Sequence, residues 1–505
     1  MPPRPRRNAD TGAVRRDAKR RRASSDRWMH LTASEVSSRT IIQCGWALTN
    51  RAVARTTYFA AAMLALRQAV LHADPAIATD IQPVITLLVA QIAIYSQAAN
   101  SHRNLDRLLY DIPDEEYRHN RTQTPRKHLR IASLSDDRTA EKMTSFNVGQ
   151  LRRLYACFGL EQYCLSNGST DIRIHTGHYS PTGRPKCYLF HPEELFLFSL
   201  AKIKTGKTNE QLCDDYFGGD YSRWGLGYRW FVFYLDERYA SIIGYQGILR
   251  FLPEFGSFRR ALQEFVKKER IYHDNNGNTT TFPGLDDLPY NICGLIDGTI
   301  DPCMVPFSGP ASDLEGAPRK ALYADAQETV YSGWKHLHGI KMETVFFPNG
   351  MSCVFGPVSA RANDRGTLNQ SGLDTFFTLI QAHLPPDQRC MLFGDSVYRG
   401  VLQSITTYYR AVWPAQLTPA EERCNQAFRA MRIPIEKNYG LTSCVHRLLD
   451  TRRAHWLGKT HPYAVEQLRV CHLLMNCYIC LKGDQAGHVN TFACTPPRLE
   501  DYLAL

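Results

Sequence analysis

The sequence has no hydrophobic run long enough to cross a lipid bilayer. Its longest apolar stretch, PVITLLVAQIAIY from Pro83 to Tyr95, contains a glutamine and falls short of the roughly 20 residues that a spanning helix needs. The first residues are rich in arginine and proline and form no apolar leader, so we expect no secretory signal. These two absences argue against a membrane protein and against export through a signal peptide.

The cysteines lack the regular spacing of a disulfide framework. Fifteen cysteines are scattered among apolar neighbours in a chain of 505 residues, which is typical of a reducing compartment. Cys477 and Cys480 form a CxxC pair, with Cys471-His472 before it and His488 and Cys494 after it, and this grouping admits a zinc site. The pair lies in the apolar helical stretch LLMNCYIC, which favours buried thiols over metal ligands.

Positive charge is concentrated at one end of the chain. The formal net charge is +11, and residues 1–30 hold ten Arg/Lys and three Asp, which account for +7 and leave +4 for the rest. This arm has almost nothing to bury, so we expect it to be disordered. Its cluster Lys19 to Arg22 indicates nuclear import or contact with nucleic acid, and a solvated tail is the alternative. A nuclear location follows from the first interpretation.

The rest of the chain has a globular composition, with 44% hydrophobic and 22% charged residues. Residues 31–145 predict a helical region of unassigned role that ends, from about residue 111, in a polar linker. Residues 146–290 predict a second, mainly helical region.

This second region contains a pattern typical of a helix–turn–helix unit. A helix is expected from Pro192 to about Lys204, and Thr208 with Gln211 forms a capping box for the next helix. Gly218-Gly219 ends that helix, and Asp220 or Ser222 caps a third. Arg223, Trp224 and Arg229 on the third helix are then candidates for contact with DNA. The alternative is a plain helical packing unit with an aromatic core.

Two short apolar runs further along the chain each end in an aspartate. Ile292 to Ile296 precedes Asp297-Gly298, and the run from Cys390 precedes Gly394-Asp395. Each run reads as a buried strand, and an aspartate at a strand end lies where sites tend to form, although a turn or cap is the commoner reason for one. A third carboxylate, Glu436, lies in a predicted helix. Three carboxylates in one pocket repel one another unless a hard divalent cation lies between them, so the set favours a two-metal phosphoryl-transfer site.

The elements around these carboxylates predict a mixed α/β sheet. Strands Gly339 to Pro348 and Met351 to Ala360 flank Asn349-Gly350, a strong hairpin signal. The other expected elements are a helix over 373–384, a helix end and short strand over 405–412, and helices over 418–445 and 464–481. The order strand, hairpin, helix, strand, helix, short strand, helix matches a ribonuclease-H-like fold. The predicted fold class is therefore an α/β ribonuclease-H-like domain, a mixed sheet flanked by helices, after a mainly helical region.

At this point the sequence resembles a known family. Residues about 291–480 are similar to the DDE endonuclease domain of PIF/Harbinger-type transposases and their domesticated relatives. The matching pieces, in the order of the family, are GLIDGTI, YSGWKHLHGIKMETVFFPNG, GPVSARANDRGTLNQSGL, LFGDSVYRG and RIPIEKNYG. The later CHLLMNCYIC resembles the closing helix of the family. We therefore expect a DDE endonuclease domain over 291–485, followed by a C-terminal tail, 486–505.

The resemblance implies that Asp297, Asp395 and Glu436 are the catalytic triad and hold Mg²⁺ or Mn²⁺, with two ions expected. Asp364 takes the place of the aspartate in a His-Asp pair of the family, with Asn363 before it, and is a candidate supporting residue. The implied reaction is hydrolysis of a DNA phosphodiester, followed by joining of the freed 3′-hydroxyl to target DNA. Family members often need a Myb-like DNA-binding partner, and a homo-oligomer is a further expectation.

Two other functions remain open from the sequence. A domesticated DNA-binding or scaffold protein that no longer cuts is the first, and the intact triad argues against it. A hydrolase of small phosphate esters is the second, and it gives no reason for the basic arm.

The remaining candidates are charged residues near the expected site. Six cations are candidate DNA contacts: Arg223, Arg229, Lys335, Lys341, Arg429 and Arg432. The last two precede Glu436 by seven and four residues on one helix face, where they either bind a DNA phosphate or pair with carboxylates. Asp301 is expected to be structural and in a loop, and Glu421 and Glu422 are expected at a helix start. Pro434 is expected to begin or kink the helix of Glu436.

Overall fold

The computed structural model describes most of the chain from residue 125 onward. The described residues are 125–179, 185–269, 271–273, 279–281, 291–302, 331–371, 373, 376, 377, 380, 389–398, 405–411, 415–449, 464–483 and 492–504. The expected basic arm 1–30, most of the expected region 31–145, and His488 lie outside them. No helix in this part of the chain is both long and apolar enough to cross a membrane.

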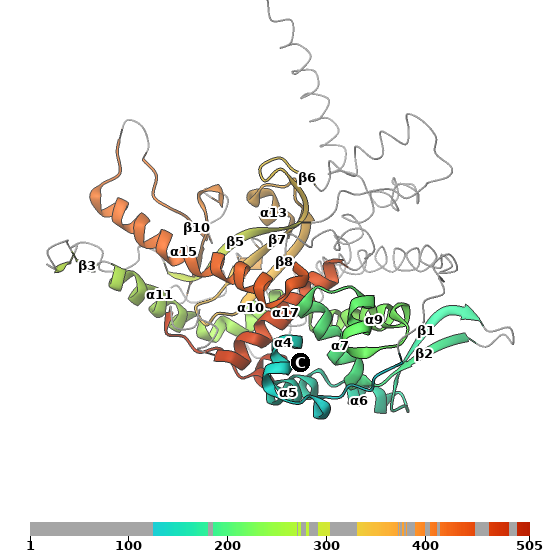
Figure 1. The fold of residues 1–505 in the computed structure, drawn as a ribbon. Coiled ribbons are helices and arrows are strands. Elements are labelled where there is room, and N and C mark those ends of the chain that lie inside the picture. The colour runs from blue at the N-terminus through green and yellow to red at the C-terminus, as the bar shows by residue number, and fades with distance from the viewer. Residues whose placement is uncertain are drawn as a thin grey trace, which may run out of the picture.

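A six-stranded mixed sheet forms the centre of the C-terminal half (Figure 1). Five of its strands follow the order β10-β9-β5-β7-β6, and the sixth strand, β8, also pairs with β7. Their bounds are β5 Ile292–Pro302, β6 Tyr331–Ser332, β7 Leu337–Phe346, β8 Ser352–Ser359, β9 Met391–Phe393 and β10 Ile405–Thr406. Strand β5 is antiparallel to β7 and parallel to β9, and β9 is parallel to β10. This mixed sheet, flanked by helices, fits a ribonuclease-H-like domain, as the sequence predicts.

The hairpin and the strand before Asp395 are confirmed, but the first strand is longer than expected. Strands β7 and β8 pair around the Asn349-Gly350 turn, where Gly350 has φ of +83°. Strand β5 does not end at Ile296 but continues to Pro302. Asp297 therefore lies inside a strand, and the expectation of a loop at Asp301 is wrong. Pairing with β7 continues through both positions, so the backbone hydrogen bonds override the local turn signal of Asp297-Gly298.

Two long helices, α11 Phe255–Glu269 and α15 Pro419–Val445, pack against β5. The buried core between them is apolar and includes Leu262, Leu295, Phe393, Phe428 and Met431. Helix α15 begins after Thr418, whose hydroxyl accepts a hydrogen bond from the backbone of Glu421 in a capping box. Pro434 lies inside the helix and does not begin it.

The helices α13 Asp364–Ser371 and α17 Ala464–Lys482 pack against the hairpin strands. Helix α13 was not expected from the sequence. Of the helix expected over 373–384, the four residues that the structure describes are helical: Leu373, Phe376, Phe377 and Ile380. The predicted terminal helix over 464–481 is confirmed by α17.

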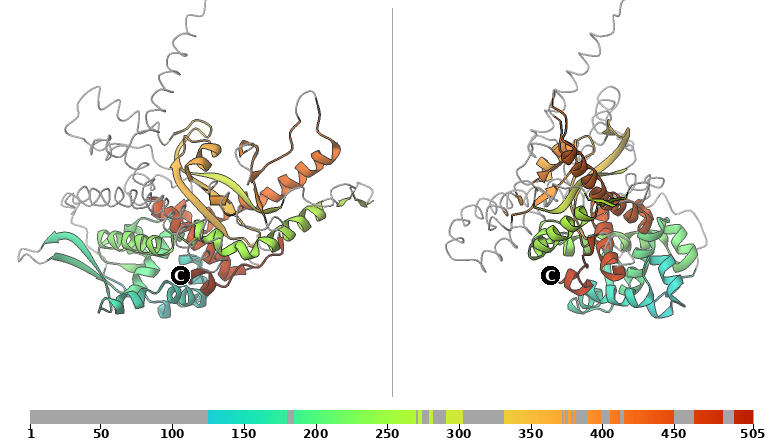
Figure 2. Two further views of the ribbon diagram at one scale, coloured as in Figure 1. Left: turned by 180° about the vertical axis from the view of Figure 1, so that it is seen from behind. Right: turned by 90° about the vertical axis from the view of Figure 1, so that its left-hand side faces the viewer.

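The N-terminal half of the described chain is mainly helical and lies to one side of the sheet in all three views (Figures 1 and 2). Its elements are α4 Asp137–Thr144, α5 Val148–Phe158, α6 Leu160–Ser166, β1 Ile172–Tyr179, β2 Pro185–Phe190, α7 Pro192–Thr205, α8 Asn209–Leu212, a π-helical turn Cys213–Phe217, α9 Tyr221–Tyr239 and α10 Tyr245–Phe251. The β1–β2 hairpin projects from this region and was not expected from the sequence. Short elements complete the described chain: 3-10 turns Ile131–Ser133, Leu252–Glu254, Ser396–Tyr398 and Arg447–Leu449, strands β3 Ile271–His273 and β4 Thr279–Thr281, and α19 Leu499–Leu503.

Helix α17 connects the two halves. It packs against β8 of the sheet and against α9 of the helical region. Between α17 and α9, the buried Arg469 forms an ion pair with Asp236, and the Tyr228 hydroxyl donates to Gln467 Oε1 at 2.8 Å. The domain boundary expected near residue 290 therefore lies within one hydrophobic core, to which the helical region and the sheet both contribute.

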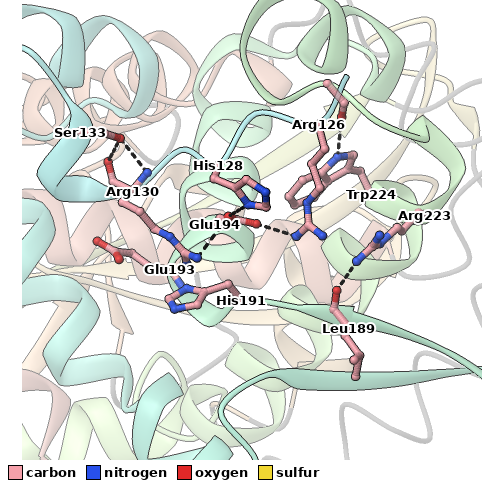
Figure 3. Close-up of polar contacts among 11 residues, drawn as sticks. Arg126, His128, Arg130, Ser133, Leu189, His191, Glu193, Glu194, Arg223 and Trp224 are labelled. Carbon is pink, nitrogen blue, oxygen red and sulfur yellow. Dashed lines mark hydrogen bonds and ion pairs between the residues drawn. The ribbon is translucent and has the colours of Figure 1, made fainter. Parts of the chain in front are cut away.

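The segment before α4, expected to be part of a linker, is folded against α7 (Figure 3). The buried carboxylate of Glu194 accepts from Arg126 at 2.6 Å and from His128 at 2.9 Å, and Arg130 lies 3.3 Å away. The backbone N–H of Lys127 also donates to the carbonyl of Phe217 at 2.8 Å. A buried carboxylate is costly unless it is paired, so Glu194 stabilises the docking of residues 126–130 and the linker interpretation is wrong for them.

Candidate active site

The three acidic residues of the predicted triad come from three elements that meet at β5. Asp297 lies in the middle of β5, and Asp395 lies two residues beyond β9, the parallel neighbour of β5. Glu436 lies on α15, which packs against β5. Leu295 of β5 pairs with Phe393 of β9, and each aspartate lies two residues further along, so the parallel pairing makes two distant sequence positions neighbours.

The guanidinium of Arg432 lies among these three carboxylates. Its Nη2 is 3.2 Å from Asp297 Oδ2 and 3.9 Å from Glu436 Oε1, and its Nη1 is 3.8 Å from Asp395 Oδ2. The side chain of Arg432 is only 14% exposed. Of the two roles left open by the sequence, pairing with carboxylates is therefore the one observed for Arg432. The contacts also show that the triad converges on a single positive charge.

The three carboxylates differ in their exposure to solvent. The side chain of Asp297 is 16% exposed, that of Asp395 39% and that of Glu436 63%. Burial raises the pKa of Asp297 to about 6, against the opposing effect of Arg432 and of the backbone N–H of Gly298. Asp297 is thus the carboxylate that the fold holds most firmly, and Glu436 is the one with most room to rotate.

Tyr439 fixes the backbone of β5 at the site. Its hydroxyl donates to the carbonyl of Asp297 at 3.0 Å, one helical turn after Glu436 on α15. The Gly298 N–H donates to Asp297 Oδ1 at 3.0 Å and orients the carboxylate. Sequence reasoning did not single out Tyr439, because its contact depends on how α15 crosses the sheet.

A second charged group lies on the neighbouring strand. The buried Lys341 forms an ion pair with Asp364 and donates to the carbonyl of Ala362 at 3.1 Å. Gly298 allows this group to approach, because a Cβ at that position would lie 2.6 Å from Asp364 Oδ1. The negative charge of Asp364 contributes to the raised pKa of Asp297. A supporting role for Asp364 therefore has a structural basis, through Lys341 and Gly298.

Two acidic residues on β5 and β7 hold their protons at higher pH than an ordinary carboxyl group. Burial raises the pKa of Glu343 to about 8 and that of Asp301 to about 7. The hydroxyl of Ser371 donates to Glu343 Oε2 at 3.1 Å. Glu343 was not singled out from the sequence, although the charged pair Lys341 and Glu343 around Met342 in an otherwise apolar run was a usable signal.

The helices of the predicted helix–turn–helix unit are present, but α9 is largely a core helix. Gln211 N–H donates to the Thr208 hydroxyl at 3.1 Å, and the Asp220 side chain caps α9, as expected. Trp224 is buried and stacks on Phe198 with ring centroids 4.7 Å apart, so its assignment to a DNA contact is wrong. A DNA-binding role for this unit stays a prediction.

The other cations of the prediction differ in their surroundings. Arg223 donates to the carbonyl of Leu189 (Figure 3). It also lies over the Phe190 ring, 5.0 Å from its centroid. Arg229 lies over the Phe233 ring at 5.7 Å. Lys335 and Arg429 are exposed, whereas Lys341 is buried in its ion pair. Contact of any of them with DNA stays a prediction, and exposure favours Lys335 and Arg429.

The CxxC pair lies on α17, where Cys477 is fully buried, as are Cys471 and His472 close by. Among the described residues, no three His, Cys, Asp or Glu side chains stand close enough to hold a metal ion as they are placed.

Comparison with known proteins bears on this site. Residues 312–476 match the family described as DDE superfamily endonuclease, about a third of the chain. The match includes Asp395 and Glu436 and begins after Asp297. Searches of curated proteins and of solved structures returned no match. Residues 312–476 are therefore similar to DDE superfamily endonucleases, and the strands and helices of this segment agree with that similarity.

Proposed function

We propose that the protein is a divalent-metal-dependent DNA endonuclease of the DDE type. The observation that carries the proposal is the convergence of Asp297, Asp395 and Glu436 on one cation, within 3.2–3.9 Å of the Arg432 guanidinium. A cluster that already holds positive charge has the donor type that Mg²⁺ and Mn²⁺ prefer, since all its ligand atoms are carboxylate oxygens. The match to the endonuclease family supplies the class of reaction.

Asp297, Asp395 and Glu436 would hold two Mg²⁺ or Mn²⁺ ions, which supply Lewis-acid activation of water and stabilisation of the leaving 3′-oxygen. The chain itself contributes position and charge. Asp297 is held by its place in β5 and by Tyr439, which hydrogen-bonds its carbonyl. Arg432 keeps the carboxylates together without metal, and its guanidinium becomes available to a DNA phosphate when it leaves them.

The finer parts of the proposal rest on the family resemblance. Joining of the freed 3′-hydroxyl to target DNA would make the protein a transposase, and this step needs two DNA segments and a homo-oligomer or a Myb-like partner to present them. A location in the nucleus, suggested by the basic arm, would give access to DNA.

Strand cleavage by the purified full-length protein tests the proposal. We expect nicking of plasmid DNA with Mg²⁺ or Mn²⁺, and its loss in Asp297→Asn, Asp395→Asn and Glu436→Gln, because these changes remove metal-binding charge needed in the transition state. DNA affinity in EDTA should change by less than about tenfold. Glu422→Gln, an exposed carboxylate on the same helix as Glu436, is the matched control and should cut normally.

The alternative is a DNA-binding or scaffold protein that no longer cuts. The specific observation in its favour is the same Arg432, which fills the centre of the triad. If the wild type cuts no DNA with either metal, with transposon-end DNA and a Myb-like partner supplied, the scaffold function replaces the nuclease. If the wild type and all three variants cut equally, the triad is assigned to the wrong residues.

A further inference from the structure

A basic pocket lies away from the triad, where the helical region meets the end of α15. It has a volume of about 490 Å³ and lies between α4, the C-terminal ends of α7 and α17, and the residues that follow α15. Five of its lining side chains are cationic, and Glu141 is the single carboxylate among them. The cations are Arg138, Lys142, Lys204, Arg447 and Lys482.

Most of this positive charge has no anionic partner in the described part of the chain. Glu141 is engaged by Lys482, whose Nζ lies 2.6 Å from its Oε1. No ion pair joins Arg138, Lys142, Lys204 or Arg447 to any described residue. Elsewhere, by contrast, buried charges such as Arg469 are paired. The pocket therefore carries an excess of positive charge that the described residues leave uncompensated.

Lys204 and Arg447 are close enough to repel one another. Burial lowers the pKa of Lys204 and the charge of Arg447 lowers it further, against smaller opposing effects of Cys444 and Glu141. The adjacent His446 adds no further positive charge, because it is buried and burial lowers its pKa to about 3, so it is neutral at pH 7. Cations placed together against their repulsion are typical of a surface that binds a polyanion.

The pocket is separated from the active site by α15. Val445 in its wall follows Glu436 by nine residues on α15, which corresponds to about 13–14 Å along the helix axis and, at about 100° per residue, to the opposite side of the helix. Arg138, Lys142 and Arg447 are exposed, which suits a chain of phosphates better than a small enclosed anion.

We propose that this pocket binds a backbone phosphate of DNA, at a contact separate from the bond that the triad would cut. The proposal rests on the nuclease function proposed above, and it adds a DNA contact made by the helical region. The phosphate would be held by Lys204 and Arg447, with Arg138 and Lys142 at the rim. Such a contact positions the duplex and carries no sequence information.

The test is DNA binding without metal, by fluorescence anisotropy of a 20-base-pair duplex in EDTA over a range of KCl concentrations. Lys204→Gln/Arg447→Gln in the full-length protein should raise the Kd about tenfold and lower the slope of log affinity against log salt by up to about 2. The matched control is Arg152→Gln/Arg173→Gln, which removes two exposed cations from α5 and β1 outside the pocket. It should change the Kd less than about twofold.

Circular dichroism and the melting temperature verify that each variant is folded. If the double variant does not fold, the single variant Arg447→Gln, at an exposed position, replaces it in the binding test. Equal losses in the pocket variant and the control would show only general electrostatics and overturn the proposal. Binding of inorganic pyrophosphate is a second measurement on the same variants. If the pocket variant loses pyrophosphate binding but keeps its DNA affinity, the pocket serves a free anion and the proposal fails. Because cleavage is not measured, a protein that never cuts DNA leaves this test intact.

Discussion

Replacement of Asp297 by asparagine should stabilise the metal-free protein at neutral and alkaline pH. Burial raises the pKa of Asp297 from 3.8 to about 6, even with Arg432 beside it. A shift of about two pKa units corresponds to about 3 kcal/mol, because one unit equals about 1.4 kcal/mol. Asparagine has nearly the same shape and cannot ionise, so the variant escapes this cost.

The sign of the effect follows from the two protonation states. Below about pH 4 the carboxyl group is largely neutral in the folded and the unfolded chain, so it changes the free energy of unfolding little. Between about pH 4 and 6 the unfolded chain releases the proton and the folded chain retains it, so the free energy of unfolding falls as the pH rises. Above the folded pKa of about 6 the loss is complete.

Urea unfolding in EDTA at pH 4 and pH 8 measures the difference in the free energy of unfolding between the wild type and Asp297→Asn. The free energies of unfolding of wild type and Asp297→Asn should agree within about 1 kcal/mol at pH 4, and the variant should be about 3 kcal/mol more stable at pH 8. Asp301 and Glu343, whose pKa values are raised to about 7 and 8, titrate in both proteins and cancel in the difference. Mg²⁺ at 100 times its Kd should return about 2.7 kcal/mol to the wild type alone. A difference that does not change with pH would refute the reasoning.

Three further changes test other parts of the structure. Arg432→Gln removes the cation shared by the triad, so the carboxylates should bind Mn²⁺ at least about tenfold more tightly by calorimetry; unchanged affinity would mean that the guanidinium does not compete with metal. Asp236→Ala leaves Arg469 charged and buried, and should lower the free energy of unfolding by about 3–5 kcal/mol, whereas Asp236→Leu with Arg469→Met should cost less. Gly298→Ala should cost about 1–3 kcal/mol, because its Cβ would lie 2.6 Å from a carboxylate oxygen, while Gly440→Ala, with open space around it, should not destabilise the protein; equal thermal shifts would contradict this.

Elements with strong local signals could be predicted from the sequence. The helix α7 with its following glycine, the capping box at Thr208 and the Asn349-Gly350 hairpin all form as expected, since each depends on a few adjacent residues. The β1–β2 hairpin was missed, because its alternating pattern is weak in a region read as helical. The length of β5 was also missed, since pairing with β7 decides it.

Some residues of the candidate site could be placed from the sequence and others could not. Asp395 could be placed after its strand, and Glu436 on its helix, from short runs of sequence. The position of Arg432 among the carboxylates could not be derived, because it depends on the path of α15 across β5. The basic pocket draws its side chains from four separate parts of the chain, so no single stretch of sequence indicates it.

The helical region and the sheet share a core around α17, so the matched segment is not a separate folding unit. The segment that matches the endonuclease family ends inside α17 and begins after Asp297, so it holds neither the whole site nor a complete core. Recombination that moved this segment alone would leave Arg469 buried without Asp236 and would separate β7 from β5. The helical region and the sheet are therefore expected to fold as one unit, and residues 312–476 produced alone would lack the partners of both Arg469 and β7.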